Sequence, residues 1–125
     1  MVGLVIVCHS NKLADGLLHE LRMFSKTCPI AVAGGDDNND YGTSYTKIKN
    51  AIDEVYDEDG VCIIVDVGSS FMVAQMIIEE LNDDKIVLLD CSLLENAIEI
   101  VMSSEQGKTL TQIVDDINNK KRNLN

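Results

Sequence analysis

The chain has 125 residues and a formal net charge of −11, and 46% of its residues are hydrophobic but only 4% are aromatic. This length predicts a single domain over residues 1–125, built around an aliphatic core. The acidic balance argues against partners that are nucleic acids or anionic membranes, since both require clustered Lys and Arg. The apolar runs are too short to cross a bilayer, so we expect no membrane insertion.

The cysteines and the N-terminus bear on location. Cys8, Cys28, Cys62 and Cys91 form no C-x-x-C pair, and the two histidines add no zinc spacing. Cys62 lies inside an apolar run, as is typical of a core thiol, and cysteines used in this way indicate a reducing compartment. Residues 1–7 lack the features of a signal peptide and predict a strand. We therefore expect a cytoplasmic protein without a metal.

The first half of the chain alternates between strand and helix. Residues 4–8 form an apolar run typical of a buried strand, and residues 13–24 place Leu and Phe at helical spacing. A second strand is expected over residues 29–33. After a polar loop rich in Asp and Asn, a helix over residues 43–56 is expected, capped by either of its first two residues.

The second half continues the alternation and ends on helices. Residues 61–66 form a third apolar run, and residues 69–81 form a helix opened by one of two serines. A fourth strand is expected over residues 85–89. Two helices, over residues 94–103 and 110–119, complete the chain.

This succession of elements predicts the fold class. The strands are apolar without alternation, which indicates a parallel sheet buried between helix layers. Right-handed crossovers restrict the arrangement to a doubly wound sheet. We expect one α/β domain with a four-stranded, mainly parallel sheet in the strand order 2-1-3-4 and helices on both faces.

Ligands of such sheets bind beyond the carboxyl ends of the strands, so the segments that follow the strands indicate the site. These segments are residues 8–11, 34–35 with 42–44, 66–70 and 90–92. Two of them combine glycine with hydroxyl groups, and the first holds a lone ionisable group, His9. Small residues and helix N-termini present N–H groups to an anion, which suggests a site for a single phosphoryl group.

His9 is the only histidine at this edge. A neutral imidazole is a competent nucleophile near pH 7, and Asp66 could accept its Nδ1–H so that Nε2 attacks. The alternative for His9 is a structural, hydrogen-bonded residue. The alternative for Asp66 is a helix cap or turn residue. His19 follows the pattern of a helix surface.

The sequence does not match several more specific nucleotide-binding and catalytic motifs. No G-x-G-x-x-G follows the first strand, and residues 107–109 mimic the end of a P-loop without its earlier glycine, since Met102 stands there. A cysteine phosphatase would need an arginine where Ala14 stands. An aspartyl-phosphate receiver would need further acids where His9 stands. We therefore expect no nucleotide or metal cofactor.

Several segments together resemble the mannose-family IIA domains of the phosphotransferase system. Within that family they are most similar to the phosphoryl-carrier subunits of phosphotransferase-dependent dihydroxyacetone kinases. The resemblance covers nearly the whole chain. It is carried by VIVCHS (5–10), LADGL (13–17), GG (34–35), GTS (42–44), DVGSS (66–70), and Asp90 with LLENA (93–97).

The resemblance implies an activity and its partners. His9 would be phosphorylated at Nε2 by the phosphocarrier protein HPr, with Asp66 orienting the ring. The phosphoryl group would then pass to the ADP-bound subunit of dihydroxyacetone kinase. The resemblance also implies a homodimer. It gives phosphate-binding roles to Ser10, Gly35, Thr43, Ser44, Gly68 and Ser69.

The sequence departs from the family pattern at Cys8, Val73, Ser92 and Asn96, where Ser, Asn, Pro and Gly are expected. These departures bear on partner specificity more than on phosphorylation. Two alternatives stay open. One is a sugar-transporter IIA domain that donates to a IIB protein, and the other is a non-catalytic sensing module.

A hydrophobic rim for docking is a further prediction. Phe71, Met72 and Leu94 follow the strands at the same edge as His9. Each of them could instead belong to the core.

Overall fold

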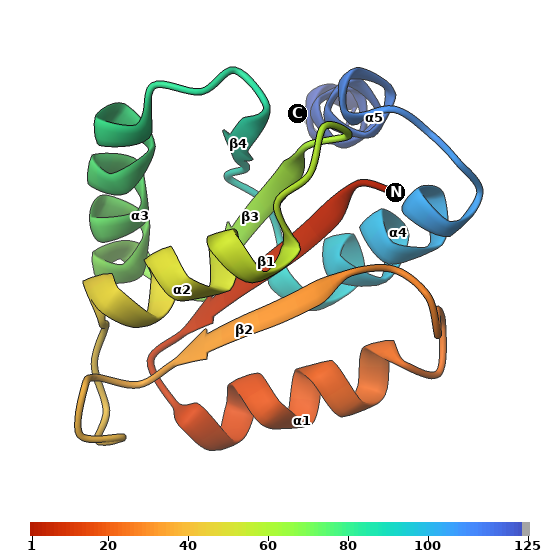
Figure 1. The fold of residues 1–125 in the computed structure, drawn as a ribbon. Helices are drawn as coiled ribbons and strands as arrows, with labels where there is room; N and C mark the ends of the chain where they lie inside the picture. The colour runs from red at the N-terminus through yellow and green to blue at the C-terminus, as the bar shows by residue number, and fades with distance from the viewer. Residues whose placement is uncertain (124–125) are drawn as a thin grey trace.

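The computed structural model describes residues 1–123 and confirms the expected α/β fold (Figure 1). Its strands and helices alternate along most of the chain. The elements are β1 (Gly3–Cys8), α1 (Asn11–Leu21), β2 (Ile30–Gly34), α2 (Tyr45–Val55), β3 (Val61–Val65), α3 (Gly68–Leu81), β4 (Ile86–Leu88), α4 (Leu93–Glu105) and α5 (Leu110–Asn123).

The described strands form one sheet in the order β2-β1-β3-β4, as expected. Each of the three pairings is parallel, so the sheet is wholly rather than mainly parallel. Cys8 at the end of β1 lies abreast of Gly34 at the end of β2. Val7 lies abreast of Val65 at the end of β3. The register therefore brings the segments after three strands to one edge.

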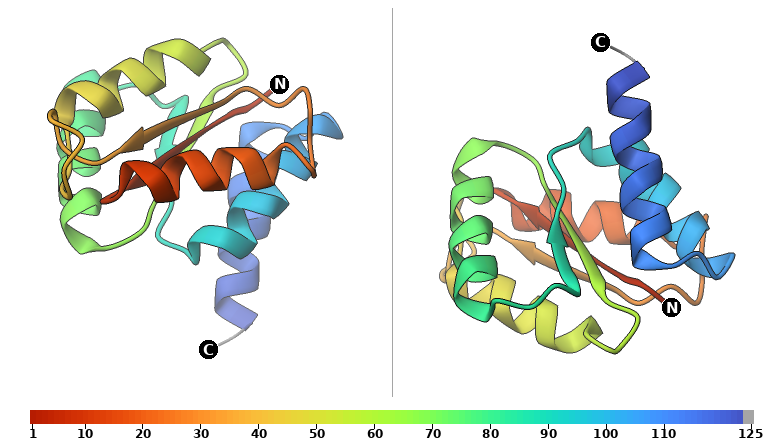
Figure 2. Two further views of the ribbon diagram at one scale, coloured as in Figure 1. Left: turned by 90° about the horizontal axis from the view of Figure 1, so that it is seen from below. Right: turned by 90° about the horizontal axis from the view of Figure 1, so that it is seen from above.

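Helices cover both faces of the sheet (Figure 2). One core joins Leu4, Ile6 and Cys8 of β1 to the buried sides of α1, α4 and α5. The other joins Val5 and Val7 of the same strand to α2 and α3. Because successive side chains of a strand point to opposite faces, one apolar strand supplies both cores.

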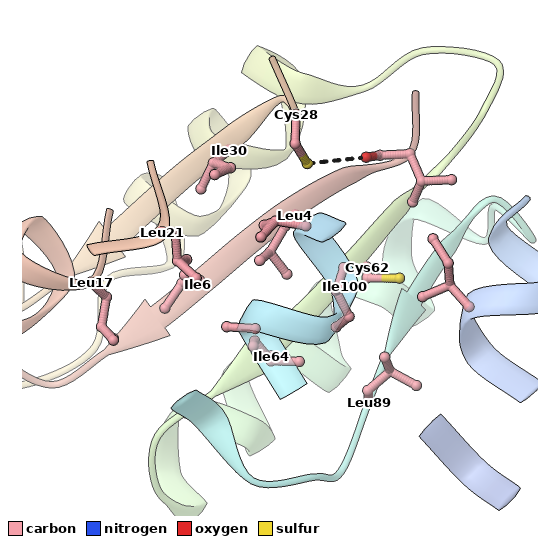
Figure 3. Packing of buried hydrophobic residues seen from close by; sticks show 14 of the residues in the cluster. Leu4, Ile6, Leu17, Leu21, Cys28, Ile30, Cys62, Ile64, Leu89 and Ile100 are labelled. Atoms are coloured by element: carbon pink, nitrogen blue, oxygen red, sulfur yellow. Dashed lines mark hydrogen bonds between the residues drawn. The ribbon is translucent and has the colours of Figure 1, made fainter. Parts of the chain in front are cut away.

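The first of these cores is aliphatic and contains three of the cysteines, Cys8, Cys28 and Cys62. Ile6 and Ile64 pack beneath Ile100 of α4, and Cys28 donates its thiol hydrogen to the carbonyl oxygen of Val2 at 3.6 Å (Figure 3). Full burial of an aliphatic side chain contributes about 1.5–3 kcal/mol. The sheet edge is therefore fixed by packing, and its polar residues need not hold the fold together.

Gly34 allows an unusually close approach between β2 and α1. A Cβ atom at this position would lie 2.7 Å from the Cα atom of Asn11 and 2.7 Å from the Cβ atom of Ala14. Such distances are below any van der Waals contact, so only glycine fits without displacement of the helix. This contact sets the start of α1 directly against the end of β2.

Some helix boundaries differ from the expected ones. Helix α1 begins at Asn11 rather than residue 13 because Ser10 caps it. Helix α3 begins at Gly68, with Val67 at the cap position and no side-chain cap. Hydroxyl caps can be recognised in a sequence, but an uncapped start has no such signal.

The C-terminal helix α5 continues past residue 119, through Lys120 and Lys121. The ammonium group of Lys120 lies 3.7 Å from Glu99, and that of Lys121 lies 3.4 Å from the carboxylate of Asp90. Both lysines therefore lie against acidic neighbours. Within residues 1–123, no helix combines the length and the apolar composition needed to cross a bilayer.

Candidate functional site

His9 lies directly after β1, at the edge where the carboxyl ends of the strands meet. Its backbone carbonyl accepts a hydrogen bond from the N–H of Gly42 at 3.0 Å. Its backbone N–H donates to Asp66 Oδ2 at 2.9 Å. The main chain of His9 is thus fixed from both sides, and its side chain remains 26% exposed.

Asp66, which follows β3, holds the ring as well as the main chain of His9. Asp66 Oδ1 lies 3.0 Å from His9 Nδ1 and also accepts the N–H of Val67 at 2.8 Å. Burial raises the pKa of Asp66, but the hydrogen bonds from His9 and Val67 outweigh burial and leave the pKa below its usual value. An ionised carboxylate can only accept, so Nδ1 carries the hydrogen and Nε2 presents its lone pair.

Ser69 lies against that lone pair. Its Oγ atom is 2.5 Å from His9 Nε2, so the hydroxyl donates to the unprotonated nitrogen. Ser69 belongs to the first turn of α3, whose N-terminus has no side-chain cap. The free N–H groups of a helix start favour an anion, so the uncapped turn stands beside the nucleophilic nitrogen.

A second serine of the same turn reaches the other ring nitrogen. Ser70 Oγ lies 3.2 Å from His9 Nδ1 and 2.9 Å from Thr43 Oγ1. The side chain of Ser70 is completely buried. Thr43 is therefore connected to the imidazole through Ser70 rather than directly.

Gly35 shapes the loop that carries Thr43. Its φ of +76° lies in the left-handed region, and a Cβ atom would stand 2.7 Å from the carbonyl oxygen of Asp40. Its N–H already donates to Cys8 at 3.0 Å, and a parallel bridge joins it to Thr43. Its conformation is thus used to shape the loop, and its N–H has a backbone partner.

Two of the expected hydroxyls serve as helix caps. Ser10 accepts the N–H of Leu13 at 3.2 Å, and Ser44 accepts the N–H of Lys47 at 3.0 Å while donating to the carboxylate of Asp37. Of the residues expected to bind phosphate, the structure therefore brings Ser69 to the ring and Gly68 to the open turn beside it. Thr43 is connected to the ring through the hydroxyl of Ser70.

Ser70 was not among the expected site residues. The signal for it was present, because Ser70, Ala74 and Ile77 follow the i, i+4, i+7 spacing of one helix face. Ala74 and Ile77 are both buried, so this face points at the sheet. A serine at the start of that face must meet the sheet edge where His9 lies.

Cys8 is adjacent to His9 in the chain but belongs to the core. It is fully buried, and burial raises the pKa of its thiol to about 12. A thiol in this state is a poor nucleophile near neutral pH. The neighbouring imidazole is thus the available nucleophile at the end of β1.

Two small hollows flank the histidine. One of about 290 Å³ lies between Asp66, Phe71 and Cys91. The other, of about 260 Å³, lies between Ser10 and Tyr41. In the described part of the chain, no three His, Cys, Asp or Glu side chains are grouped to hold a metal ion. The geometry suits a small anion held at the surface.

Comparisons with known proteins place the chain in a family. Residues 3–114 match the family model EIIA-man, described as PTS system fructose IIA component. The chain is 30% identical to the PTS-dependent dihydroxyacetone kinase, phosphotransferase subunit DhaM, of Lactococcus lactis, covering 92% of each. It is 33% identical over 123 residues to the phosphoryl donor subunit DhaM of Escherichia coli, covering 93% of this chain. The chain spans only about a quarter of that longer relative (26%).

Solved structures agree on the fold. A protein of unknown function, EF1359, superimposes with a TM-score of 0.81 at 25% identity, over 95% of each chain. The phosphotransferase system component EIIA from Streptococcus agalactiae superimposes with a TM-score of 0.72 at 24% identity, over 98% of this chain and 94% of that one. With most of its length matched by the family model, the chain belongs to the EIIA-man family of phosphotransferase-system IIA components, and the DhaM subunits are among its relatives.

Proposed function

We propose that the chain is a phosphohistidine carrier, in which His9 Nε2 accepts a phosphoryl group from HPr and passes it to the ADP-bound subunit of a dihydroxyacetone kinase. The observation that carries the proposal is the double attachment of His9 to Asp66. The carboxylate accepts the main-chain N–H at 2.9 Å and lies 3.0 Å from Nδ1. One residue thus fixes both the position and the tautomer of the imidazole.

The transfer step follows from that tautomer. The Nε2 lone pair attacks the phosphorus of the donor's phosphohistidine, a P–N bond to Nε2 forms, and the donor's P–N bond breaks with its electron pair returning to the donor nitrogen. The Nδ1–H proton stays in place, shared with Asp66. The carboxylate offsets the positive charge that grows on the ring. Delivery to the acceptor reverses these roles.

Groups in the first turn of α3 would stabilise the transferred group. Ser69 must release Nε2 before the P–N bond forms, and its hydroxyl can then donate to a phosphoryl oxygen. Gly68 and Ser69 belong to the start of α3, which has no side-chain cap, and the N–H groups of such a helix start favour the negative charge of a phosphoryl group.

The acceptor is proposed from the relatives. The Lactococcus lactis protein is named a phosphotransferase subunit of a dihydroxyacetone kinase, and the chain matches it over nearly its whole length. The description of the family model, a fructose IIA component, favours the alternative acceptor, a sugar-specific IIB protein. We retain the kinase as the first acceptor and extend the proposal to a cytoplasmic homodimer.

The test is transfer of labelled phosphate from phosphoenolpyruvate through enzyme I and HPr. We expect one acid-labile, base-stable phosphate per chain, absent from His9→Gln. His19→Gln is the matched control, since His19 is exposed on α1 and should leave labelling unchanged. Stable labelling of His9→Gln would overturn the assignment.

The acceptor is tested by adding the ADP-loaded kinase subunit to the labelled chain. Formation of labelled ATP on that subunit supports the proposal. Movement of the label to a sugar-specific IIB protein instead would support the alternative. A chain that never acquires label would support the sensing module.

A further inference from the structure

We infer that Ser70 is a positioning residue for His9, because its hydroxyl is a second acceptor for Nδ1–H and relays a hydrogen bond to Thr43. The part of this inference that concerns transfer rate rests on the proposed function. The part that concerns the imidazole does not.

Among the described residues, the Ser70 hydroxyl has two hydrogen-bond partners, the His9 ring and Thr43. Its Oγ atom lies 3.2 Å from His9 Nδ1 and 2.9 Å from Thr43 Oγ1, within the usual range for hydrogen bonds. The residue is fully buried, so water cannot replace either partner. A buried hydroxyl without a partner is costly, and both contacts are therefore expected to persist.

The direction of the two bonds follows from Asp66. Because the carboxylate accepts from Nδ1, that nitrogen carries a hydrogen and cannot accept one from Ser70. Ser70 Oγ is then an acceptor toward the ring, and its own hydrogen must go to Thr43 Oγ1. The hydroxyl hydrogen of Thr43 is left free to point elsewhere.

Two consequences follow for the imidazole. Nδ1–H is shared between an acceptor on the loop after β3 and one in the first turn of α3, so the ring is held by two points rather than one. The chain of hydroxyls also links the ring to the loop that carries Thr43. Hydrogen bonds linked in this way reinforce one another.

The experiment uses Ser70→Ala in the full chain. Alanine fits the space and favours a helix, so the fold should be kept. In ¹H–¹⁵N spectra of the histidine side chains we expect the His9 Nδ1–H proton to exchange faster with water and the Nε2–H tautomer to increase. Phosphoryl transfer should be about three- to tenfold slower, as expected for the loss of one neutral hydrogen bond.

Ser104→Ala is the matched control. Ser104 is also fully buried and donates to the carbonyl of Val2, far from the site along β1. This variant should lower the thermal midpoint and leave the His9 resonances unchanged. Thr43→Val tests the relay, because it removes only the acceptor of the Ser70 hydroxyl hydrogen and should reproduce part of the change in exchange seen for Ser70→Ala.

The outcomes separate this inference from the proposed function. An unchanged Nδ1–H signal in Ser70→Ala would overturn the inference, whatever the transfer rate. A changed signal with an unchanged rate would overturn the role in transfer. A changed signal in a chain that HPr does not label would support the positioning of the ring and reject the proposed function.

Discussion

The two ends of the sheet differ in a way that cavity size does not reveal. The amino end has the larger hollow, about 440 Å³, lined by Asp59, Lys85 and Lys108 among others. Two of its charged side chains form ion pairs at the surface, Asp59 with the N-terminal ammonium group and Lys108 with Asp116 at 2.9 Å. The carboxyl end has smaller hollows, but His9 and Asp66 meet there between strand ends and helix starts.

The difference shows what makes a reactive site in this fold. At the carboxyl end, the side chains of His9, Asp66 and Ser70 each make two or more hydrogen bonds. The first turn of α3 is left without a side-chain cap. At the amino end, Gly107, Lys108 and Thr109 imitate part of a phosphate-binding loop without a strand before them. Preorganised polar groups, rather than volume, distinguish the candidate site.

The largest effect on phosphoryl transfer is expected when Asp66, at the carboxyl end, is replaced. Asp66→Ala eliminates one charge-assisted hydrogen bond to the ring, worth about 1.5–3 kcal/mol, so transfer should slow about ten- to a hundredfold. Stopped-flow or quenched transfer from phosphorylated HPr measures this rate. Asp66→Asn keeps an acceptor without the charge and should fall between the two. Equal rates for all three proteins would make Asp66 purely structural.

A smaller effect is expected at the rim of the carboxyl end. Met72 is 71% exposed and Leu94 is 50% exposed, whereas Phe71 is half-buried. If Met72 contacts the donor, Met72→Glu should slow transfer from HPr about three- to tenfold by placing a charge in an apolar contact. The melting temperature should not change, since the side chain supports little core. An unchanged rate would exclude Met72 from the docking surface.

Acid should lower the stability of the fold partly through Asp66, at the carboxyl end of the sheet. The folded-state pKa of Asp66 is depressed, so its contribution to stability is complete above the ordinary value of about 4 and is lost as the pH falls through the lower folded value. Urea unfolding at pH 7 and at pH 3 should therefore show a smaller acid loss for Asp66→Asn than for the unchanged chain. A loss of the same size in both would assign the acid sensitivity to other carboxylates.

The smallest effect is expected at the amino end. Lys108→Ala removes an exposed ion pair, worth at most about 1 kcal/mol, and should alter phosphoryl transfer less than about twofold. Equilibrium unfolding and the labelling assay together check both statements. A large loss of transfer would show that the amino end participates after all.

The fold and the central pair of the site could be predicted from the sequence because each follows a simple rule. Apolar runs of five or six residues, interrupted by helical periodicity, indicate a buried parallel sheet. The ends of neighbouring strands then bring His9 and Asp66 together. Both rules depend on chain order and hydrophobic pattern, which the sequence records directly.

The hydroxyl groups could not be assigned in the same way. Ser10, Ser44, Ser69 and Ser70 all follow strands, yet two of them cap helices and two meet the ring. Their roles depend on where each helix begins, and a shift of one residue rotates a side chain by about 100° around the helix axis. The packing of each helix sets its rotation about its axis, and this rotation cannot be deduced from the composition.

Because of the close approach at Gly34, the position of His9 depends on a residue that has no functional side chain. Any larger residue would push Asn11 outward, and the displacement would reach Ser10 and His9 through two peptide bonds. In a randomised library selected for transfer, residue 34 should therefore be as intolerant as the nucleophile itself. At residue 34 the structure leaves room only for the hydrogen atom of glycine.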